Sequence, residues 1–255
     1  MSITREQQLQ YLEAMGIQGW TARHTDQSAA IAPGPVLPDT PAPVADDVGV
    51  PAPAAPAADV FAATSDVAGL DWPALEARVS DCRLCELHTS RTRTVFGVGN
   101  RSADWLVIGE APGHDEDQQG EPFVGRAGQL LNAMLQAAGL RREQVYIANI
   151  LKCRPPDNRD PKAEEVVCCE PYLLRQIELL QPRLILAVGR IAAQNLLNTQ
   201  SPIGKLRGEV HRFRDTGIPL IATYHPAYLL RSPLEKRKSW QDLQLALRTL
   251  QEADG

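Results

Sequence analysis

Short apolar runs alternate with amphipathic helical patterns over most of the chain after residue 70. Four of these runs are only a few residues long and continuously apolar, which predicts buried strands. They cover residues 105–108, 145–150, 183–188 and 218–223. Apolar residues at three- and four-residue spacing predict helices between and after them. These helices cover residues 127–138, a segment starting at 160, 191–197 and 240–250.

Strands and helices that alternate in this way predict an α/β fold. We expect a three-layer sandwich with a central, mainly parallel four-stranded sheet. The helix after the second strand is expected to start with Asp160 as its N-cap and Pro161 at its first position. Ligands of such sheets bind beyond the carboxyl ends of the strands. Chemistry is therefore expected in the loops that begin near Gly109, Asn149 and Tyr224.

The first 70 residues have a different character. Residues 1–24 are expected to contain a short N-terminal helix, with Leu9, Leu12 and Met15 near one face. Residues 25–69 are rich in alanine and proline and predict a disordered linker. The folded domain is expected over residues 70–255. A short helix on a long tether suits docking to a protein partner.

Charge and hydropathy limit the binding partners and the cellular locations to be expected for the protein. The formal net charge is −5, with −6 in residues 1–70 and +1 in the remainder, so charge alone gives no support to nucleic-acid binding. No apolar run approaches membrane-spanning length, and the start lacks a signal-peptide pattern. We expect a cytoplasmic monomer without a membrane partner. The five cysteines are then expected to be ligands or catalysts rather than disulfides.

Four cysteines are candidate metal ligands: a C-x-x-C pair, Cys82 and Cys85, followed by Cys153 and by Cys169 sixteen positions further on. Four thiolates suit tetrahedral zinc or an iron–sulfur cluster, and the spacing does not choose between them. Cys168 competes with Cys169 for the fourth position. Cys169 lies on the apolar stripe of its predicted helix, so we assign it as the ligand. The alternative is that all five are thiols of the core.

Three loops carry candidate site residues. The first contains Glu110, Glu116 and Phe123, where a carboxylate could activate water and an aromatic ring could stack on a base. Asn149, at a strand end, could present a donor and an acceptor to a base edge. His225 follows the fourth strand. Each has an ordinary alternative: an acidic surface loop, a turn residue, or a structural histidine. A P-loop motif is absent from the sequence.

Together these motifs resemble the family 4 uracil-DNA glycosylases, the iron–sulfur branch of that superfamily. The resemblance extends from about Trp72 to Leu250. It is carried by CRLCELHTSRTRTVFGVGN, GEAPGHDEDQQGEPFVGRAGQLL, YIANILKCRPPDNRDP and HPAYLLR. It implies the fold of that superfamily and a structural 4Fe-4S cluster. The implied cluster ligands are Cys82, Cys85, Cys153 and Cys169.

The resemblance also implies an activity and a role for each site residue. The enzyme would flip uracil out of DNA and hydrolyse its N-glycosidic bond, which initiates base excision repair. Phe123 would stack on the flipped base, and Asn149 would read the uracil N3–H and O4. His225 would lie near O2, Glu116 near C5, and Glu110 nearest the attacking water and the sugar.

Two other functions remain open from the residues alone. One is a non-enzymatic nucleic-acid-binding module stabilised by an iron–sulfur cluster or by zinc, and the other is a zinc hydrolase. Four basic residues are candidates for phosphate contacts, with ordinary exposed charges as the alternative. They are Lys152, Arg154, Arg159 and Arg231. The apolar run that follows His225 could wedge into a base stack or pack against the closing helix.

Overall fold

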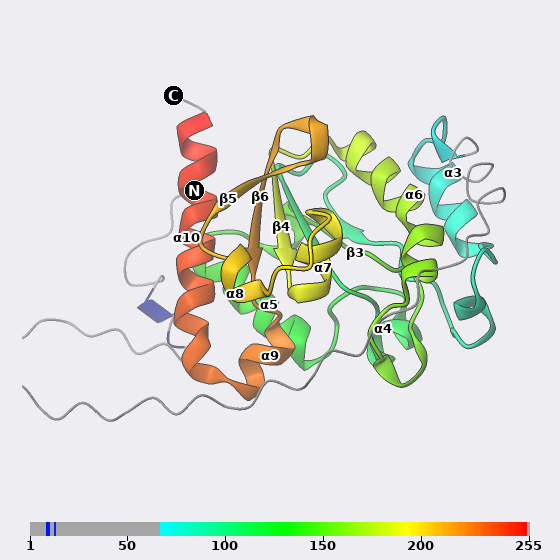
Figure 1. The fold of residues 1–255 in the computed structure, drawn as a ribbon, viewed down its shortest axis with the longest axis horizontal. Coiled ribbons are helices and arrows are strands. Elements are labelled where there is room, and N and C mark those ends of the chain that lie inside the picture. Colours follow the sequence, from blue (N-terminus) through cyan, green and yellow to red (C-terminus); the bar gives the residue numbers. More distant parts are fainter. Residues whose placement is uncertain (1–8, 11–12, 14–66, 254–255) are drawn as a thin grey trace, which may run out of the picture.

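A six-stranded sheet forms the centre of the computed structural model, in the strand order β1-β3-β2-β4-β6-β5 (Figure 1). The strands are β1 (Val98–Gly99), β2 (Trp105–Gly109), β3 (Tyr146–Asn149), β4 (Leu184–Val188), β5 (Val210–Phe213) and β6 (Ile218–Thr223). Strands β3, β2, β4 and β6 pair in parallel, whereas β1 and β5 pair antiparallel at the two edges. The predicted α/β sandwich with a mainly parallel sheet is confirmed.

The sheet has six strands rather than the four expected from the sequence. The four predicted strands are its parallel centre, and each is buried along most or all of its length. The two missed strands lie at the edges. β1 has only two residues, and β5 (VHRF) is largely exposed, so neither contains an apolar run. Edge strands with a solvated face lack the continuous hydrophobicity of buried parallel strands.

The structure describes residues 9, 10, 13 and 67–253. The predicted N-terminal helix and the predicted linker lie almost wholly outside the described residues. Within the described part, no helix combines the length and the apolar character needed to cross a membrane.

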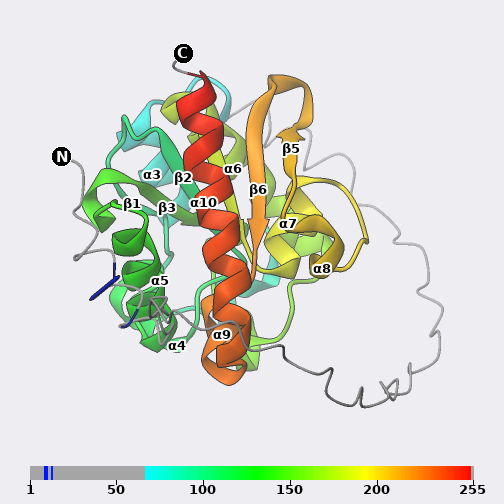
Figure 2. The same ribbon diagram turned by 90° about the vertical axis from the view of Figure 1, so that its left-hand side faces the viewer.

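Helices cover both faces of the sheet and complete three layers (Figures 1 and 2). They are α3 (Trp72–Ser80), α4 (His114–Gln119), α5 (Arg126–Ala137), α6 (Ala163–Leu180), α7 (Arg190–Leu196), α8 (Ile203–Leu206), α9 (Pro226–Arg231) and α10 (Lys236–Ala253). Short 3-10 turns lie at Glu86–Thr89, Arg142–Gln144, Pro156–Asn158, Arg214–Thr216 and Pro233–Glu235. α5 and α10 pack on one face, while α6 and α7 pack on the other.

Alternation along the strands builds these two layers. Val107 on β2 and Leu186 on β4 point into the core with α5 and α10. Their neighbours Leu106 and Ile185 point into the core with α6 and α7. Successive strand residues face opposite sides of a sheet, so a continuously apolar strand supplies both cores at once. The strands are therefore held on both faces, and their carboxyl ends are fixed in space.

Helix α6 starts two residues later than predicted. Its N-cap is Lys162, whose backbone N–H donates to the carboxylate of Glu165 at 2.8 Å. This capping arrangement displaces Asp160 from the helix start. The carboxylate of Asp160 instead accepts from the guanidinium of Arg190 at 2.6 Å. The prediction that Asp160 caps this helix is therefore wrong.

A buried ion pair ties α10 to the end of β6. Asp242 is fully buried, and its carboxylate accepts from the guanidinium of Arg207 at 2.8 and 3.1 Å. The same carboxylate accepts from the hydroxyl of Thr223 at 2.9 Å. Thr223 is the last residue of β6, two positions before His225. The pair thus helps to fix the strand end from which the third loop leaves the sheet.

We expect Asp242→Ala to lower the free energy of unfolding by about 3–5 kcal/mol, because it leaves the Arg207 guanidinium buried without its partner. Denaturant titration measures the change. The matched control is Glu76→Ala, which breaks a surface pair with Arg101 in which both side chains are about half exposed. The control should cost less than about 1 kcal/mol. Equal losses for the two variants would contradict this role of Asp242.

Candidate active site

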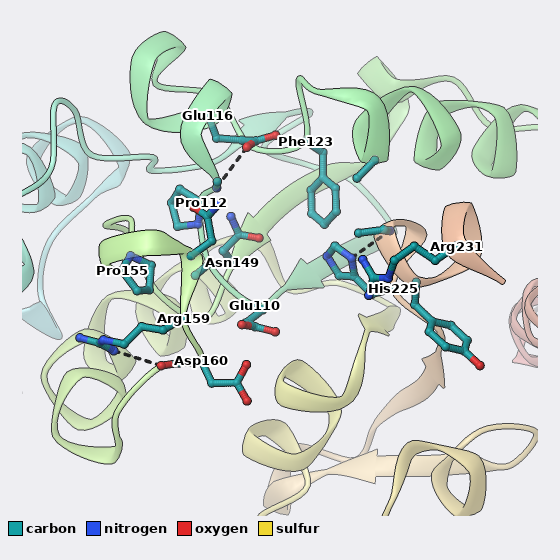
Figure 3. A pocket seen from close by; sticks show the side chains of 16 residues that line it. Glu110, Pro112, Glu116, Phe123, Asn149, Pro155, Arg159, Asp160, His225 and Arg231 are labelled. Atoms are coloured by element: carbon teal, nitrogen blue, oxygen red, sulfur yellow. Dashed lines mark hydrogen bonds between the residues drawn. The ribbon is translucent and has the colours of Figure 1, made fainter.

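A pocket of about 480 Å³ opens at the carboxyl ends of β2, β3 and β6. The predicted substrate residues all line it, and they converge on one space in Figure 3. They are Glu110, Glu116, Phe123, Asn149 and His225. Residues from three separate loops therefore meet in one cavity, because parallel strands end at the same edge of the sheet.

Phe123 forms a wall of the pocket from a constrained backbone. Its φ is +55°, in the left-handed region that side chains seldom adopt. The Arg142 guanidinium donates to the carbonyls of Pro122 at 2.5 Å and Phe123 at 3.3 Å, which holds this turn. A Cβ on Gly128 would lie 1.8 Å from the Phe123 carbonyl oxygen, so only glycine fits there. The phenyl ring stacks with the His225 imidazole, with centroids 5.6 Å apart.

Asn149 carries an unpaired acceptor. Its side chain is buried, and its Oδ1 has no hydrogen-bond partner among the described residues. A Cβ on Gly109 would lie 2.5 Å from this oxygen, so a glycine at the end of β2 leaves room for the amide. A buried acceptor without a donor costs about 1–3 kcal/mol. The Asn149 amide is therefore ready to accept a hydrogen bond from a ligand and to donate one beside it.

His225 is a neutral hydrogen-bond donor. It is the N-cap of α9, and its Nδ1 accepts from the backbone N–H of Ala227 at 3.2 Å. In a neutral imidazole one nitrogen accepts and the other carries the proton, so the proton lies on Nε2. Burial, with a contribution from the positive charge of Arg231, lowers the pKa of His225 to about 4. At neutral pH the ring therefore offers an N–H without bringing a charge.

Glu110 lies just beyond β2 and is half-buried in the pocket. Burial raises its pKa to about 7, and the nearby carboxylate of Asp160 acts in the same direction. The positive charge of Arg190 acts in the opposite direction. Desolvation disfavours the ionised carboxylate, so Glu110 changes charge near neutral pH. The pocket therefore contains a carboxyl group whose protonation varies under ordinary conditions.

Glu116 organises the loop that carries Phe123. Its carboxylate accepts from the backbone N–H groups of Gly113 at 3.0 Å, Val124 at 3.0 Å and Gly125 at 3.2 Å. These bonds tie the first turn of α4 to the residues that follow Phe123. The predicted place of Glu116 beside a base C5 stays a prediction. Its three hydrogen bonds give it a role in holding the pocket wall.

The basic residues that are candidates for phosphate contacts differ in their burial and in their hydrogen-bond partners. Lys152 is buried, and its Nζ donates to the Asn149 carbonyl at 2.9 Å and to Gln176 Oε1 at 2.6 Å. The prediction that Lys152 contacts phosphate is therefore wrong. Arg159 lines the pocket but is paired with Glu165 at 2.5 Å. Arg231 is exposed at the pocket rim, where phosphate could reach it.

Two polar residues of the pocket were missed by the sequence analysis. Asp160 and Asn158 both line the cavity from the loop that follows β3. Both belong to the motif YIANILKCRPPDNRDP, in which the sequence predicts a helix cap for Asp160 and no role for Asn158. The available signal was their position on the same strand-end loop as Asn149, because loops at one edge of a parallel sheet share a crevice.

The five cysteines gather around a second, much smaller pocket, which residues of α3 and α6 also line. Cys169 is buried, and its Sγ accepts from the backbone N–H of Lys152 at 3.2 Å. Cys153 is also buried, and its Sγ accepts from the Arg91 guanidinium at 3.1 Å. Cys168 is more exposed and donates to the Leu84 carbonyl at 3.3 Å.

Burial raises the pKa of Cys85 to about 11 and that of Cys169 to about 12, so ionised thiols here need a positive partner. A bound metal group supplies one, and it deprotonates the thiols that bind it. N–H groups directed at the sulfurs of Cys153 and Cys169 suit thiolate ligands. Soft sulfur donors from three segments therefore fit zinc or an iron–sulfur cluster. Among the described residues, no three His, Cys, Asp or Glu side chains form a ready-made metal site.

Comparison with known proteins identifies the family that this chain resembles. The model of the uracil DNA glycosylase superfamily matches residues 96–244. A type-4 uracil-DNA glycosylase of Archaeoglobus fulgidus is 50% identical over 161 residues, which are 61% of this chain and 81% of that protein. A type-4 uracil-DNA glycosylase of Pyrobaculum aerophilum is 42% identical over 180 residues, which are 68% of this chain and 92% of that protein.

We expect Glu110→Gln to raise the thermal unfolding temperature at pH 8. A raised pKa means that the folded state binds the proton more tightly than the unfolded state. Ionising Glu110 as the pH rises from about 4.5 to about 7 therefore lowers stability. Glutamine avoids this loss, so its advantage should shrink as the pH falls towards 5. Thermal melts at pH 5 and 8 measure it, with the exposed Glu209→Gln as control. A stability advantage that is the same at both pH values would contradict the raised pKa of Glu110.

Proposed function

The chain belongs to the uracil DNA glycosylase superfamily, within its type-4 group, and we propose that it excises uracil from DNA by hydrolysing the N-glycosidic bond. One observation carries the proposal: the unpaired Oδ1 of Asn149 lies in a pocket walled by Phe123 and a neutral His225. This set can recognise one planar base and stabilise it as it leaves.

Uracil must leave the base stack before it can enter this pocket, at a cost of about a few kcal/mol. Phe123 supplies an aromatic surface for the flipped base. The Asn149 Oδ1 accepts from uracil N3–H, and the amide Nδ2 donates to O4. Cytosine has the opposite pattern on this edge, with an acceptor at N3 and an amino donor at C4. With cytosine, Asn149 Oδ1 would face the acceptor N3, and Nδ2 would face the C4 amino donor. This mismatch discriminates against the normal base.

Glycosidic bond cleavage develops negative charge on uracil and positive charge on the deoxyribose. His225 would donate from Nε2 to uracil O2 and stabilise the leaving anion. A neutral donor suits this role, because its protonation does not change around neutral pH. Glu110, when ionised, would oppose the charge on the sugar and orient the attacking water. Excision is therefore expected to need the deprotonated form of Glu110.

Glu116 combines two proposed contributions. Its bonds to three backbone N–H groups hold the turn that presents Phe123. We place its side chain near uracil C5, where the methyl group of thymine would clash. A wall fixed by three hydrogen bonds cannot retreat cheaply from an added methyl group. This supports discrimination between uracil and thymine at that position.

We propose that Cys82, Cys85, Cys153 and Cys169 hold a 4Fe-4S cluster. The cluster would cross-link the loop after α3, the loop after β3 and helix α6, and its contribution would be structural. Gathering of the thiols around one small pocket supports this proposal. Cys168 would not be a cluster ligand. It is more exposed than Cys153 and Cys169, and its thiol donates to the Leu84 carbonyl.

The non-enzymatic binding module is the weaker candidate. Binding along a nucleic-acid backbone relies on exposed basic residues, whereas this chain gathers Glu110, Asn149 and His225 with an aromatic ring in one pocket. The proposed substrate is uracil-containing DNA, with Arg231 as a phosphate contact at the rim. We propose a cytoplasmic location, where thiols stay reduced. A monomeric state and a protein partner for the N-terminal helix stay predictions.

We expect Asn149→Ala to slow uracil release on the order of a hundredfold, since the base loses its main polar contacts in the pocket. The assay is alkaline cleavage of a uracil-containing single-stranded oligonucleotide after incubation with the protein. Asn195→Ala on α7, which is not among the pocket residues, is the matched control and should cleave at the wild-type rate. Normal cleavage by Asn149→Ala would show that the pocket is misplaced, and no cleavage by the wild type would refute the function.

We expect Cys169→Ser to lose iron and Cys168→Ser to retain it. Cys169 is buried with an N–H directed at its sulfur, whereas Cys168 is more exposed and bonded to Leu84. Iron content and visible absorption of the two purified variants measure the difference. Retention by Cys169→Ser together with loss by Cys168→Ser would reverse the assignment. A colourless wild type containing zinc would exclude the cluster.

A further inference from the structure

A buried lysine connects the base-reading strand end to helix α6. Lys152 is only 1% exposed, and its ammonium group donates to two neutral acceptors. One is the carbonyl oxygen of Asn149 at 2.9 Å, and the other is Gln176 Oε1 at 2.6 Å. Burying an ammonium group is expensive unless hydrogen bonds compensate it. The proposed reaction does not use this side chain directly.

The Asn149 carbonyl lies where the parallel ladder stops. Gly109 and Asn149 are the last paired residues of β2 and β3. Beyond them the chain is held by two further backbone bonds, from Ile150 N–H to the Gly109 carbonyl at 2.9 Å and from Leu151 N–H to the Glu110 carbonyl at 3.0 Å. The carbonyl of Asn149 itself is bound by a side chain. Lys152 therefore supplies the side-chain hydrogen bond to the backbone of the residue that carries the unpaired Oδ1.

The other end of this connection is rigid. Gln176 on α6 is fully buried, and its Nε2 donates to the Phe96 carbonyl at 2.9 Å and to the Tyr146 hydroxyl at 3.3 Å. The same helix carries Cys169, whose sulfur accepts from the backbone N–H of Lys152. Lys152 is thus attached to α6 through both its side chain and its backbone.

We propose that Lys152 is a positioning residue for uracil recognition, which holds the Asn149 backbone so that the side-chain amide meets the base edge. The inference rests on the proposed function. Methionine at this position would fill similar space but leave two buried acceptors without their donor. The end of β3 would then be free to shift. A misplacement on the order of 1 Å in a reacting complex costs roughly a hundredfold in rate.

The test is a double-mutant cycle on the full-length, iron-loaded protein. Single-turnover excision is measured for the wild type, Lys152→Met, Asn149→Ala and the double variant. Lys152→Met alone should slow excision roughly tenfold to a hundredfold. Its affinity for uracil-containing DNA should be unchanged, because the ammonium is buried away from phosphate. In the Asn149→Ala background the same substitution should cause little further slowing, because the residue it positions is gone.

Controls separate positioning from loss of charge or of fold. Lys205→Met removes an exposed positive charge on α8 and should leave excision unchanged. Iron content and melting temperature are read on every sample. Gln176→Leu supplies a second variant, because it removes the anchor of the ammonium group while Lys152 remains. It should show the same non-additivity with Asn149→Ala.

Three results would overturn the inference while leaving the proposed function intact. In the first, the effects of Lys152→Met and Asn149→Ala multiply in an active protein. In the second, Lys152→Met excises at the wild-type rate. Loss of iron or fold in both Lys152→Met and Gln176→Leu would assign Lys152 a structural role alone and would also overturn it. A wild type unable to release uracil would refute the proposed function, and this inference with it.

Discussion

The pairing of Gly109 with Asn149 at the ends of β2 and β3 is the constraint on which the site depends. Parallel register brings the two residues side by side, and the missing side chain of Gly109 leaves the space in which Asn149 and Phe123 meet. A Cβ there would lie 2.5 Å from the amide oxygen of Asn149 and 2.6 Å from the ring of Phe123. The core on both faces of the sheet fixes this register, since a slip would turn buried side chains outward.

Unfavourable features gather at this end of the sheet. Phe123 has a left-handed backbone, Asn149 has an unpaired acceptor, Glu110 is a carboxyl group that resists ionisation, and Lys152 is a buried ammonium. Each lowers the stability of the free protein, and each suits the binding of a base or the stabilisation of charge during cleavage. The rest of the domain compensates through two apolar cores. Local strain at a functional site is tolerated when the surrounding structure is well determined.

The sequence was sufficient to predict the parallel centre of the sheet, because its strands are continuous apolar runs. It also predicted the convergence of Glu110, Phe123, Asn149 and His225, since each follows a strand that ends at the same edge. It could not predict β5, whose exposed face breaks the apolar pattern, or the displacement of Asp160, which depends on competition from Glu165 for the helix start. The burial of Lys152 was equally hidden, because its partner Gln176 is distant in sequence.

The most direct test of the central claim is a crystal structure of the protein with free uracil bound. We expect uracil N3 to lie about 2.7–3.2 Å from Asn149 Oδ1, with the ring against Phe123 and with O2 towards His225 Nε2. Uracil bound elsewhere, or bound here with Asn149 Oδ1 still unpaired, would contradict the claim that this amide exists to read the base.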